Sequence, residues 1–201
     1  MVTTPVEADW VLARLARPAP TRTAFVELRG SALLKTPLRI EGEYRRPRED
    51  TLVREVRVPY AETTTIVTGK SGIGQVQIAR AGKSPRAFPL SRAPELGGLQ
   101  VSFGALLAGD RVRLEQHYRI VAEGTRGRWM LTLTPKQTAL AATLRSVVLR
   151  GRGAELRCIE TRSARGEMQR TLLAGAARTA YGIMDVSALT TLCHGNATAV
   201  R

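Results

Sequence analysis

Hydrophobic and polar side chains alternate along much of this chain with the period of two that is typical of a half-buried β-strand. The pattern is clearest in residues 129–134, where Trp129, Leu131 and Leu133 share one face. Pro135 follows and ends the strand, because proline has no N–H to donate to a neighbouring strand. Residues 128–150, around which the chain is organised, therefore begin with a strand.

A short helix and a second strand complete this stretch. Residues 136–144 are rich in Ala, Leu, Gln and Lys, which suits roughly two helical turns. Leu140 and Leu144 lie on one face of such a helix, since positions i and i+4 are neighbours. Residues 145–149 return to a strand pattern. The stretch predicts a curved antiparallel sheet with a helical segment near its mouth.

Short strand candidates recur along the rest of the chain, separated by glycine, proline and charged turns. They are two runs within residues 23–44, followed by 51–58, 63–68, 74–80, 86–90, 115–121, 154–161 and 167–173. Residues 45–48 are expected to form a charged turn. Short strands at spacings of roughly 8–12 residues predict a β-sandwich or a β-barrel.

Two further segments have helical patterns. Residues 7–17 place Trp10 and Leu15 close to one face, and the acidic residues precede the arginines, as the helix dipole favours. Residues 94–107 carry apolar side chains at spacings of three and four, which predicts an apolar helix despite three glycines. Residues 175–201 show no clear period and are expected to form a tail or an added edge segment.

The composition fits a folded domain with an unusually basic surface. The chain has 201 residues, a hydrophobic fraction of 43% and a formal net charge of +14. This length fits one domain. The charge comes mostly from arginines scattered through the predicted strands, so it indicates either attraction to nucleic acid or phospholipid, or solvated strand faces. Solvated faces are favoured, because stacking aromatic residues do not interleave with basic runs.

Targeting and cysteine patterns leave two questions open. No stretch approaches the roughly 20 apolar residues that cross a bilayer, so we expect a soluble chain. Residues 11–16 are too short for a signal peptide and contain Arg14. A removed leader would leave the same sequence, so secretion stays possible. Cys158 and Cys193 form either a disulfide in an oxidising compartment or two unrelated thiols.

Groups that carry out catalysis are scarce. The two histidines, His117 on a predicted strand and His194 near the C-terminus, show no spacing typical of metal ligands. A lone histidine on a strand is more often a surface residue than a catalyst. No nucleophile elbow of the Gly-x-Ser-x-Gly type is present. The sequence therefore predicts no enzyme, no metal and no cofactor.

The order of the elements and three short motifs carry a resemblance to a known family. The motifs are Gly42-Glu43-Tyr44, Leu107-Ala108-Gly109-Asp110, and the run from Trp129 to Pro135. Over about residues 9–173 the chain resembles the LolA family of periplasmic lipoprotein carriers. It is most similar to the divergent branch associated with aryl-polyene and xanthomonadin-type pigment clusters. The resemblance implies an unclosed antiparallel β half-barrel (α+β, mainly β) covered by short helices in residues 1–174, with residues 175–201 as the tail or edge segment.

The resemblance also implies an apolar cavity that holds acyl chains. The alternating strand faces are expected to supply its wall, namely Val26, Leu28, Leu38, Ile40, Leu52, Val56, Val67, Val76, Ile78, Trp129, Leu131 and Leu133. The lid is expected to consist of Leu96, Leu99, Phe103 and Leu106, together with Leu140 and Leu144. In the family an arginine before a proline tethers the lid, and Arg46 before Pro47 stands at the matching place. Alternatively, Arg46 is a solvated turn residue.

Three functions follow from these observations. The first is a non-enzymatic periplasmic carrier or chaperone for a lipid, an acyl chain or a lipoprotein. The resemblance links this carrier to outer-membrane delivery of an aryl-polyene-type lipid, by a monomer with an inner-membrane donor and an outer-membrane acceptor as partners, and leaves the identity of the cargo open. The alternatives are a basic β-barrel that binds nucleic acid, and a cargo-free scaffold or adaptor at a membrane. In the carrier, residues 94–107 are expected to close the empty cavity and to be displaced by cargo.

Overall fold

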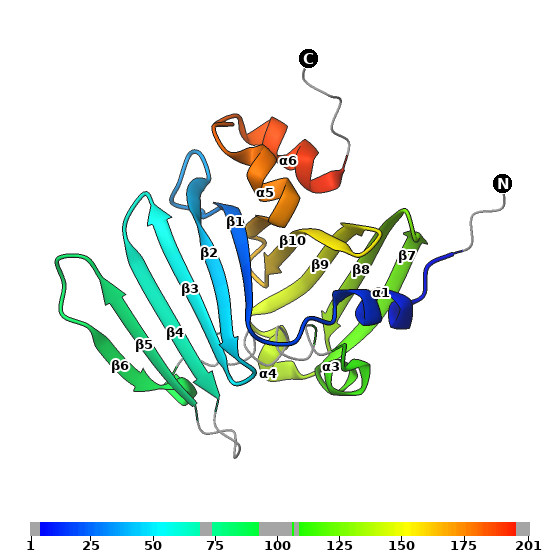
Figure 1. The fold of residues 1–201 in the computed structure, drawn as a ribbon, viewed down its shortest axis with the longest axis horizontal. Helices are drawn as coiled ribbons and strands as arrows, with labels where there is room; N and C mark the ends of the chain where they lie inside the picture. The colour runs from blue at the N-terminus through cyan, green and yellow to red at the C-terminus, as the bar shows by residue number, and fades with distance from the viewer. Residues whose placement is uncertain (1–4, 69–73, 93–105, 107–108, 196–201) are drawn as a thin grey trace.

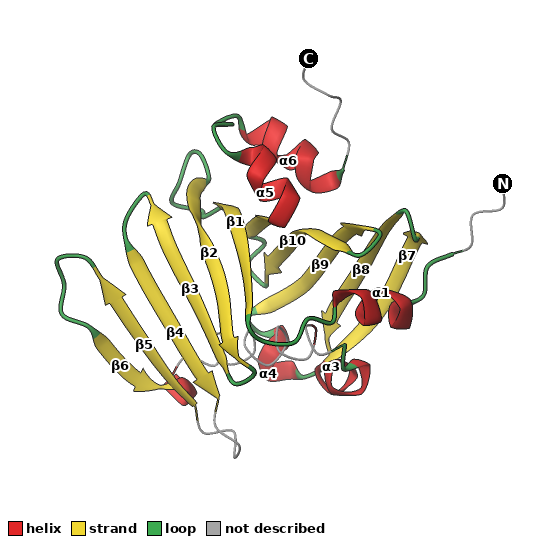
Figure 2. Cartoon of the chain, in the orientation of Figure 1, coloured by secondary structure: helices red, strands yellow, loops and turns green. Residues whose placement is uncertain are grey.

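One large antiparallel sheet organises the chain. The computed structural model describes residues 5–68, 74–92, 106 and 109–195. Its sheet has 11 strands in the order β6-β5-β4-β3-β2-β1-β11-β10-β9-β8-β7 (Figure 1). The two end strands, β6 and β7, do not pair with each other, so the sheet is open. Helices lie against it at several places (Figure 2). The expected unclosed antiparallel sheet with covering helices is confirmed.

The strands and helices have the following bounds. The strands are β1 (Thr21–Arg29), β2 (Leu38–Arg48), β3 (Thr51–Val58), β4 (Glu62–Thr68), β5 (Gly74–Arg80), β6 (Arg86–Pro89), β7 (Tyr118–Thr125), β8 (Arg128–Pro135), β9 (Leu144–Arg152), β10 (Glu155–Ser163) and β11 (Met168–Leu173). The helices are α1 (Ala8–Leu15), η1 (Leu90–Arg92), α3 (Arg111–His117), α4 (Thr138–Ala141), α5 (Ala174–Ala180) and α6 (Val186–His194).

Two meanders build the sheet, and they meet at its centre. Strands β1 to β6 follow one another outward in one direction, and β7 to β11 return from the opposite edge. The join is the antiparallel pairing of β1 with β11, in which Phe25 lies opposite Leu173. Neighbouring strands that are consecutive in sequence need only short turns. The central pairing is different, because it joins residues 140 to 148 positions apart and depends on the whole fold.

The sheet has two faces, which we name after the helices that cover them. One row of the α1 face crosses six adjacent strands and consists of Leu131, Leu149, Ile159, Thr171, Glu27 and Ile40. The next row, on the α5–α6 face, consists of Thr132, Val148, Glu160, Arg170, Leu28 and Arg39. Side chains alternate between the faces because successive Cβ atoms of a strand point in opposite directions.

The core of the α1 face lies between α1 and strands β7 to β10. Val11, Leu12 and Leu15 of α1 are buried against Leu131 and other apolar side chains of these strands. This burial explains the one-sided apolar pattern of the helix. Trp129 packs over Gly151, where a Cβ atom would overlap its indole ring. The Trp129 Nε1–H donates to the Gly153 carbonyl at 2.9 Å, which satisfies the polar atom of this buried side chain.

Helices α5 and α6 cover the opposite face near the centre of the sheet. Their alanines and leucines pack on Val26, Leu28 and Leu172. Asp185 caps α6, since its carboxylate accepts a hydrogen bond from the Ala188 backbone N–H at 2.6 Å. A disulfide joins Cys193 of α6 to Cys158 of β10. The structure thus decides between the two states left open for these cysteines.

Several expected elements need correction. Residues 45–48 continue β2 and do not form a turn, because they pair with β1 and β3. The helix expected at 136–144 is reduced to α4, and Leu144 begins β9. Residues 115–117 belong to α3, whose N-cap is Asp110. Residues 175–195, expected as a tail or edge segment, form the helices of the α5–α6 face. Their small, weakly periodic side chains gain order from contact with the sheet.

Candidate functional site

A pocket with a volume of about 140 Å³ lies where the two halves of the sheet meet on the α1 face. We call it the central pocket. Its apolar lining is Leu15, Leu52, Leu106, Leu156 and Leu173, and its polar lining includes Thr21, Thr23, Tyr44, Arg17, Arg45 and Arg46. Ala154 of the β9–β10 turn and Glu155 of β10 complete one side. The pocket therefore combines an apolar floor with hydroxyl and guanidinium groups, which suits one end of an amphiphile.

A buried carboxylate lies beside this pocket on the α1 face. Glu27 is fully buried, and its side chain accepts hydrogen bonds from Arg29 at 2.7 Å and from Arg54 at 3.3 Å. The Arg54 guanidinium also lies over the Phe25 ring, 5.0 Å from its centroid. A charge this deeply buried requires paired, hydrogen-bonded partners. We call Glu27, Arg29, Arg54 and Tyr44 the Glu27 cluster.

Tyr44 connects the Glu27 cluster with the central pocket. Its ring lies 4.7 Å from that of Phe25, and its hydroxyl interacts with Arg54. Burial, reinforced by the negative charge of Glu27, raises the pKa of Tyr44 to about 12. The hydroxyl is therefore neutral at physiological pH, and it links the central pocket to Arg54 of the Glu27 cluster.

Arg46, the expected lid tether, is buried at the rim of the central pocket. One of its guanidinium nitrogens donates to the Arg17 carbonyl at 2.7 Å, and another forms an ion pair with Glu49. Burial lowers the pKa of Arg46. Among the described residues, Arg46 thus holds the segment between α1 and β1. Its alternative reading as a solvated turn residue is wrong, while its role toward residues 94–107 stays a prediction.

The structure separates the expected wall residues between the two faces. Strand register brings nine of them to the α1 face, namely Leu38, Ile40, Leu52, Val56, Val76, Ile78, Trp129, Leu131 and Leu133. Val26 and Leu28 lie beneath α5 and α6 on the opposite face, and Val67 shares that face. These three assignments are corrected. Both faces of β1 are apolar because both are covered, so alternation could not tell them apart.

Only one of the nine, Leu52, lines the central pocket. Leu131 and Leu133 are buried beneath α1 as ordinary core. A charge at Leu131 would therefore test folding and not ligand binding. The role of the remaining α1-face residues as a ligand-binding wall stays a prediction.

The expected lid lies largely outside the described residues. This holds for Leu96, Leu99 and Phe103. Leu106 is described, and it is buried against the α1 core and the central pocket. Leu140 and Leu144 are partly buried against the same core. The lid assignment stays a prediction.

Sequence reasoning missed the Glu27 cluster and the apolar side chains from turns and strand ends. Glu27 occupies a polar position in an otherwise apolar strand, which is a weak signal by itself. Leu156 and Leu173 lie at strand ends, so their facing depends on a register shift and on the central pairing. Leu156 and Leu173 come together with Leu15 in the central pocket only in the folded protein.

Within the described ranges, one group of side chains has metal-ligand types in proximity, formed by Glu160, Cys193 and His194. The disulfide removes the Cys193 thiolate, and Glu160 is already bonded to Arg150 and Arg170. This arrangement does not suit a metal ion. In the part of the chain that the structure describes, no helix is both long and apolar enough to cross a membrane.

The fold and the central pocket define a class of protein, an open helix-covered antiparallel sheet with a partly apolar pocket at its centre. The chain belongs to the outer membrane lipoprotein carrier protein LolA-like family, whose sequence model matches residues 2–197. That match includes the helices of the α5–α6 face. Members of this family are carrier proteins. A search of curated proteins found no significant match.

Solved structures with a similar fold have low sequence identity. A LolA superfamily protein from Nitrosomonas europaea is 12% identical with a TM-score of 0.41, over 84% of this chain and 92% of the other. LprF from Mycobacterium bovis is 12% identical with a TM-score of 0.35, over 86% and 94%. A putative outer membrane lipoprotein-sorting protein domain from Vibrio parahaemolyticus is 9% identical with a TM-score of 0.32, over 88% and 97%. The family assignment rests on the sequence model and not on these scores.

Proposed function

We propose that this protein is a periplasmic carrier that binds the acyl chain of a lipid or an acylated protein on the α1 face, beginning at the central pocket. The observation that carries the proposal is the apolar floor of that pocket in a chain of the LolA-like family. The volume of about 140 Å³ is smaller than that of a typical ligand pocket. Binding a whole acyl chain therefore requires the pocket to widen.

Two observations support the finer parts of this proposal. A disulfide persists in oxidising compartments, so the Cys158–Cys193 bond supports a periplasmic location. The hydroxyl and guanidinium groups at the pocket rim favour a cargo with a polar or anionic head. The further proposals, an aryl-polyene-type lipid as cargo and transfer by a monomer from an inner-membrane donor to an outer-membrane acceptor, rest on the sequence resemblance alone.

A fluorescent fatty acid tests the proposal. Its fluorescence should rise saturably with added protein. Ala154→Phe should weaken binding, because Ala154 is an exposed residue on the pocket wall and a phenyl ring there would fill the pocket. Ala164→Phe is the matched control, since Ala164 is exposed in the β10–β11 turn and does not line the pocket. Absence of saturable binding would argue for the cargo-free scaffold. Equal binding by both variants would show that the fatty acid does not bind in the central pocket.

A further inference from the structure

A second pocket, of about 280 Å³, opens beside the C-terminal end of α6. We call it the arginine pocket. Four arginines line it, Arg128 from β8, Arg150 and Arg152 from β9, and Arg157 from β10. Its other charged lining residue is Glu123, and the end of α6 supplies Cys193, His194 and Gly195. None of these residues lines the central pocket.

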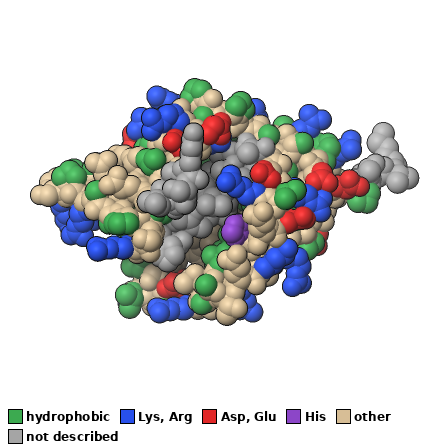
Figure 3. Space-filling model, turned by 90° about the horizontal axis from the view of Figure 1, so that it is seen from below, with side chains coloured by type: hydrophobic (Ala, Val, Ile, Leu, Met, Phe, Trp, Pro, Cys, Tyr) green, Lys and Arg blue, Asp and Glu red, His purple; other side chains and the backbone are tan. Residues whose placement is uncertain are grey.

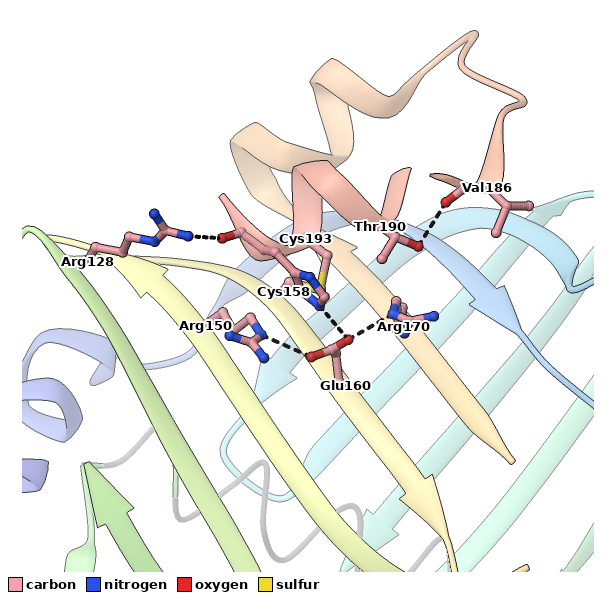
Figure 4. The surroundings of a disulfide bond; sticks show 9 residues. Arg128, Arg150, Cys158, Glu160, Arg170, Val186, Thr190 and Cys193 are labelled. Carbon is pink, nitrogen blue, oxygen red and sulfur yellow. Dashed lines mark hydrogen bonds and ion pairs between the residues drawn. A yellow bond between two sulfur atoms is a disulfide. The ribbon is translucent and has the colours of Figure 1, made fainter. Parts of the chain in front are cut away.

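The disulfide fixes the α6 side of this pocket. Cys193 is bonded to Cys158, which is next to Arg157 in β10. Arg128 donates to the His194 carbonyl at 2.7 Å, and Figure 4 shows it reaching the end of α6 from β8. The wall is therefore held at two points, one covalent and one hydrogen-bonded. A preformed wall reduces the ordering cost of ligand binding.

The arginines of this pocket are only partly neutralised. Arg150 is bonded to Glu160, and Figure 4 shows Arg150 and Arg170 converging on that carboxylate. Arg157 forms a long ion pair with Glu155, 3.4 Å, and its Nε atom is buried without a hydrogen-bond partner. Arg152 is exposed and makes no hydrogen bond or ion pair to the described residues. The exposed Arg152 guanidinium therefore retains donors for a ligand, whereas the unpaired Nε atom of Arg157 is buried.

Several other arginines of the sheet are each paired with a nearby glutamate, although the Nε atoms of Arg39 and Arg45 are also buried without a hydrogen-bond partner. Arg39 pairs with Glu41, Arg45 with Glu55 and Arg80 with Glu62, each within one strand or across a strand pair. These pairs neutralise part of the positive charge along the strands. In the arginine pocket, which is open to solvent, four arginines and one glutamate line the same hollow. The mutual repulsion of these arginines would be relieved by a bound anion.

We propose that the arginine pocket binds a phosphate group. Guanidinium groups match the oxygens of phosphate with two parallel hydrogen bonds, and they remain charged at every physiological pH. The pocket has several such groups on three adjacent strands, so a tetrahedral anion would contact more than one of them. The phosphate belongs either to a free phosphate compound or to the headgroup of a phospholipid. This site is independent of the acyl-binding function proposed above.

Calorimetric titration of the full chain with inorganic pyrophosphate, at constant ionic strength, tests the site. Saturable binding is expected. Arg152→Gln and Arg157→Gln should each weaken it about tenfold, the effect of losing one charge-assisted hydrogen bond. Arg165→Gln is the matched control, because it removes the same charge from the β10–β11 turn and should leave the affinity unchanged. Arg152 is exposed, so its variant should remain folded even if the Arg157 variant does not.

Two results would overturn the proposal. One is the absence of saturable binding, and the other is equal weakening by all three variants, which would indicate general charge attraction. Cosedimentation with phosphatidylglycerol and phosphatidylcholine vesicles then distinguishes a free phosphate compound from a phospholipid headgroup as the ligand. Vesicle binding that pyrophosphate and Arg152→Gln both reduce identifies a phospholipid headgroup. Pyrophosphate binding without vesicle binding identifies a free phosphate compound.

Discussion

Glu160 of β10 shows how a single buried carboxylate depends on its cationic neighbours. It lies on the α5–α6 face and accepts hydrogen bonds from Arg150 at 2.9 Å and Arg170 at 2.8 Å, and its other contact is the His194 ring at 3.0 Å. Burial alone would raise the pKa of this group. The hydrogen bonds from His194, Arg150 and Arg170 outweigh burial and lower the pKa of Glu160 to about 2.

This lowered pKa predicts a dependence of stability on acid pH. The free energy of unfolding should include a contribution from ionised Glu160 of about 3 kcal/mol, present above its ordinary pKa near 4.5. The contribution should be lost as the pH falls from 4.5 toward 2. In urea denaturation, Glu160→Gln should therefore be less stable than the wild type at neutral pH, and the difference should shrink in acid.

A suitable control for this measurement is Glu7→Gln, which removes the same charge from an exposed position whose side chain makes no capping hydrogen bond. The difference in the free energy of unfolding between Glu7→Gln and the wild type should be small both at neutral pH and in acid. A difference for Glu160→Gln that stays constant down to pH 2 would contradict the assignment.

At the scale of elements, the attachment of α6 to β10 is the clearest case of a helix that depends on tertiary contacts. The helix has nine residues, Val186–His194, too few for stability in isolation. Its buried side chains, Leu189, Leu192 and Cys193, all contact the α5–α6 face. The disulfide closes a loop between cysteines 35 positions apart, which includes β11 and α5.

Removing this disulfide should lower the free energy of unfolding by about 2–4 kcal/mol, mainly because the unfolded chain gains freedom. The double variant Cys158→Ala, Cys193→Ala should show this loss in urea denaturation. A reducing agent should lower the stability of the wild type and leave the double variant unchanged. If reduction leaves the wild type as stable as before, the bond does not contribute as the structure implies.

At the scale of the whole molecule, the formal charge of +14 raises the question of nucleic acid. Basic side chains are distributed around the face seen in Figure 3, with fewer acidic side chains among them. Many arginines are paired with glutamates across the sheet. Aromatic residues amount to 4% of the chain, so stacking platforms for bases are few. General attraction to phosphates is expected, without a specific nucleic-acid interface.

Mobility shifts with single-stranded and duplex DNA test this expectation. Complexes formed at low salt should disappear by about 200 mM salt, because counterion release dominates non-specific binding. The matched comparison is fatty-acid binding under the same conditions, which should persist because apolar burial does not depend on screening. Binding to one nucleic acid that survives this salt concentration would favour the nucleic-acid alternative.

Local pattern in the sequence determined most of the strands. Two of the expected strands, 51–58 and 74–80, match β3 and β5 residue for residue. The helix at the N-terminus was also predicted, because α1 buries one face only. These elements are readable because the period of side-chain burial is set by backbone geometry within each segment. The strand spacing alone predicted a sandwich or a barrel, and the open sheet was expected from the resemblance to the LolA family, which rested on element order and three short motifs.

Contacts between distant segments decided the rest. Alternation could not show which face of β1 meets the α1 core, because Phe25 and Val26 are both fully buried on opposite sides. Helices α5 and α6 have small side chains and weak periodicity, and they gain order on the sheet. Pairing of the cysteines, the central pocket and the arginine pocket all join residues from separate strands and helices. The sequence pattern shows which side chains lie on the same face of one strand or helix. Which side chains of other elements they contact depends on the order and register of the strands in the folded sheet.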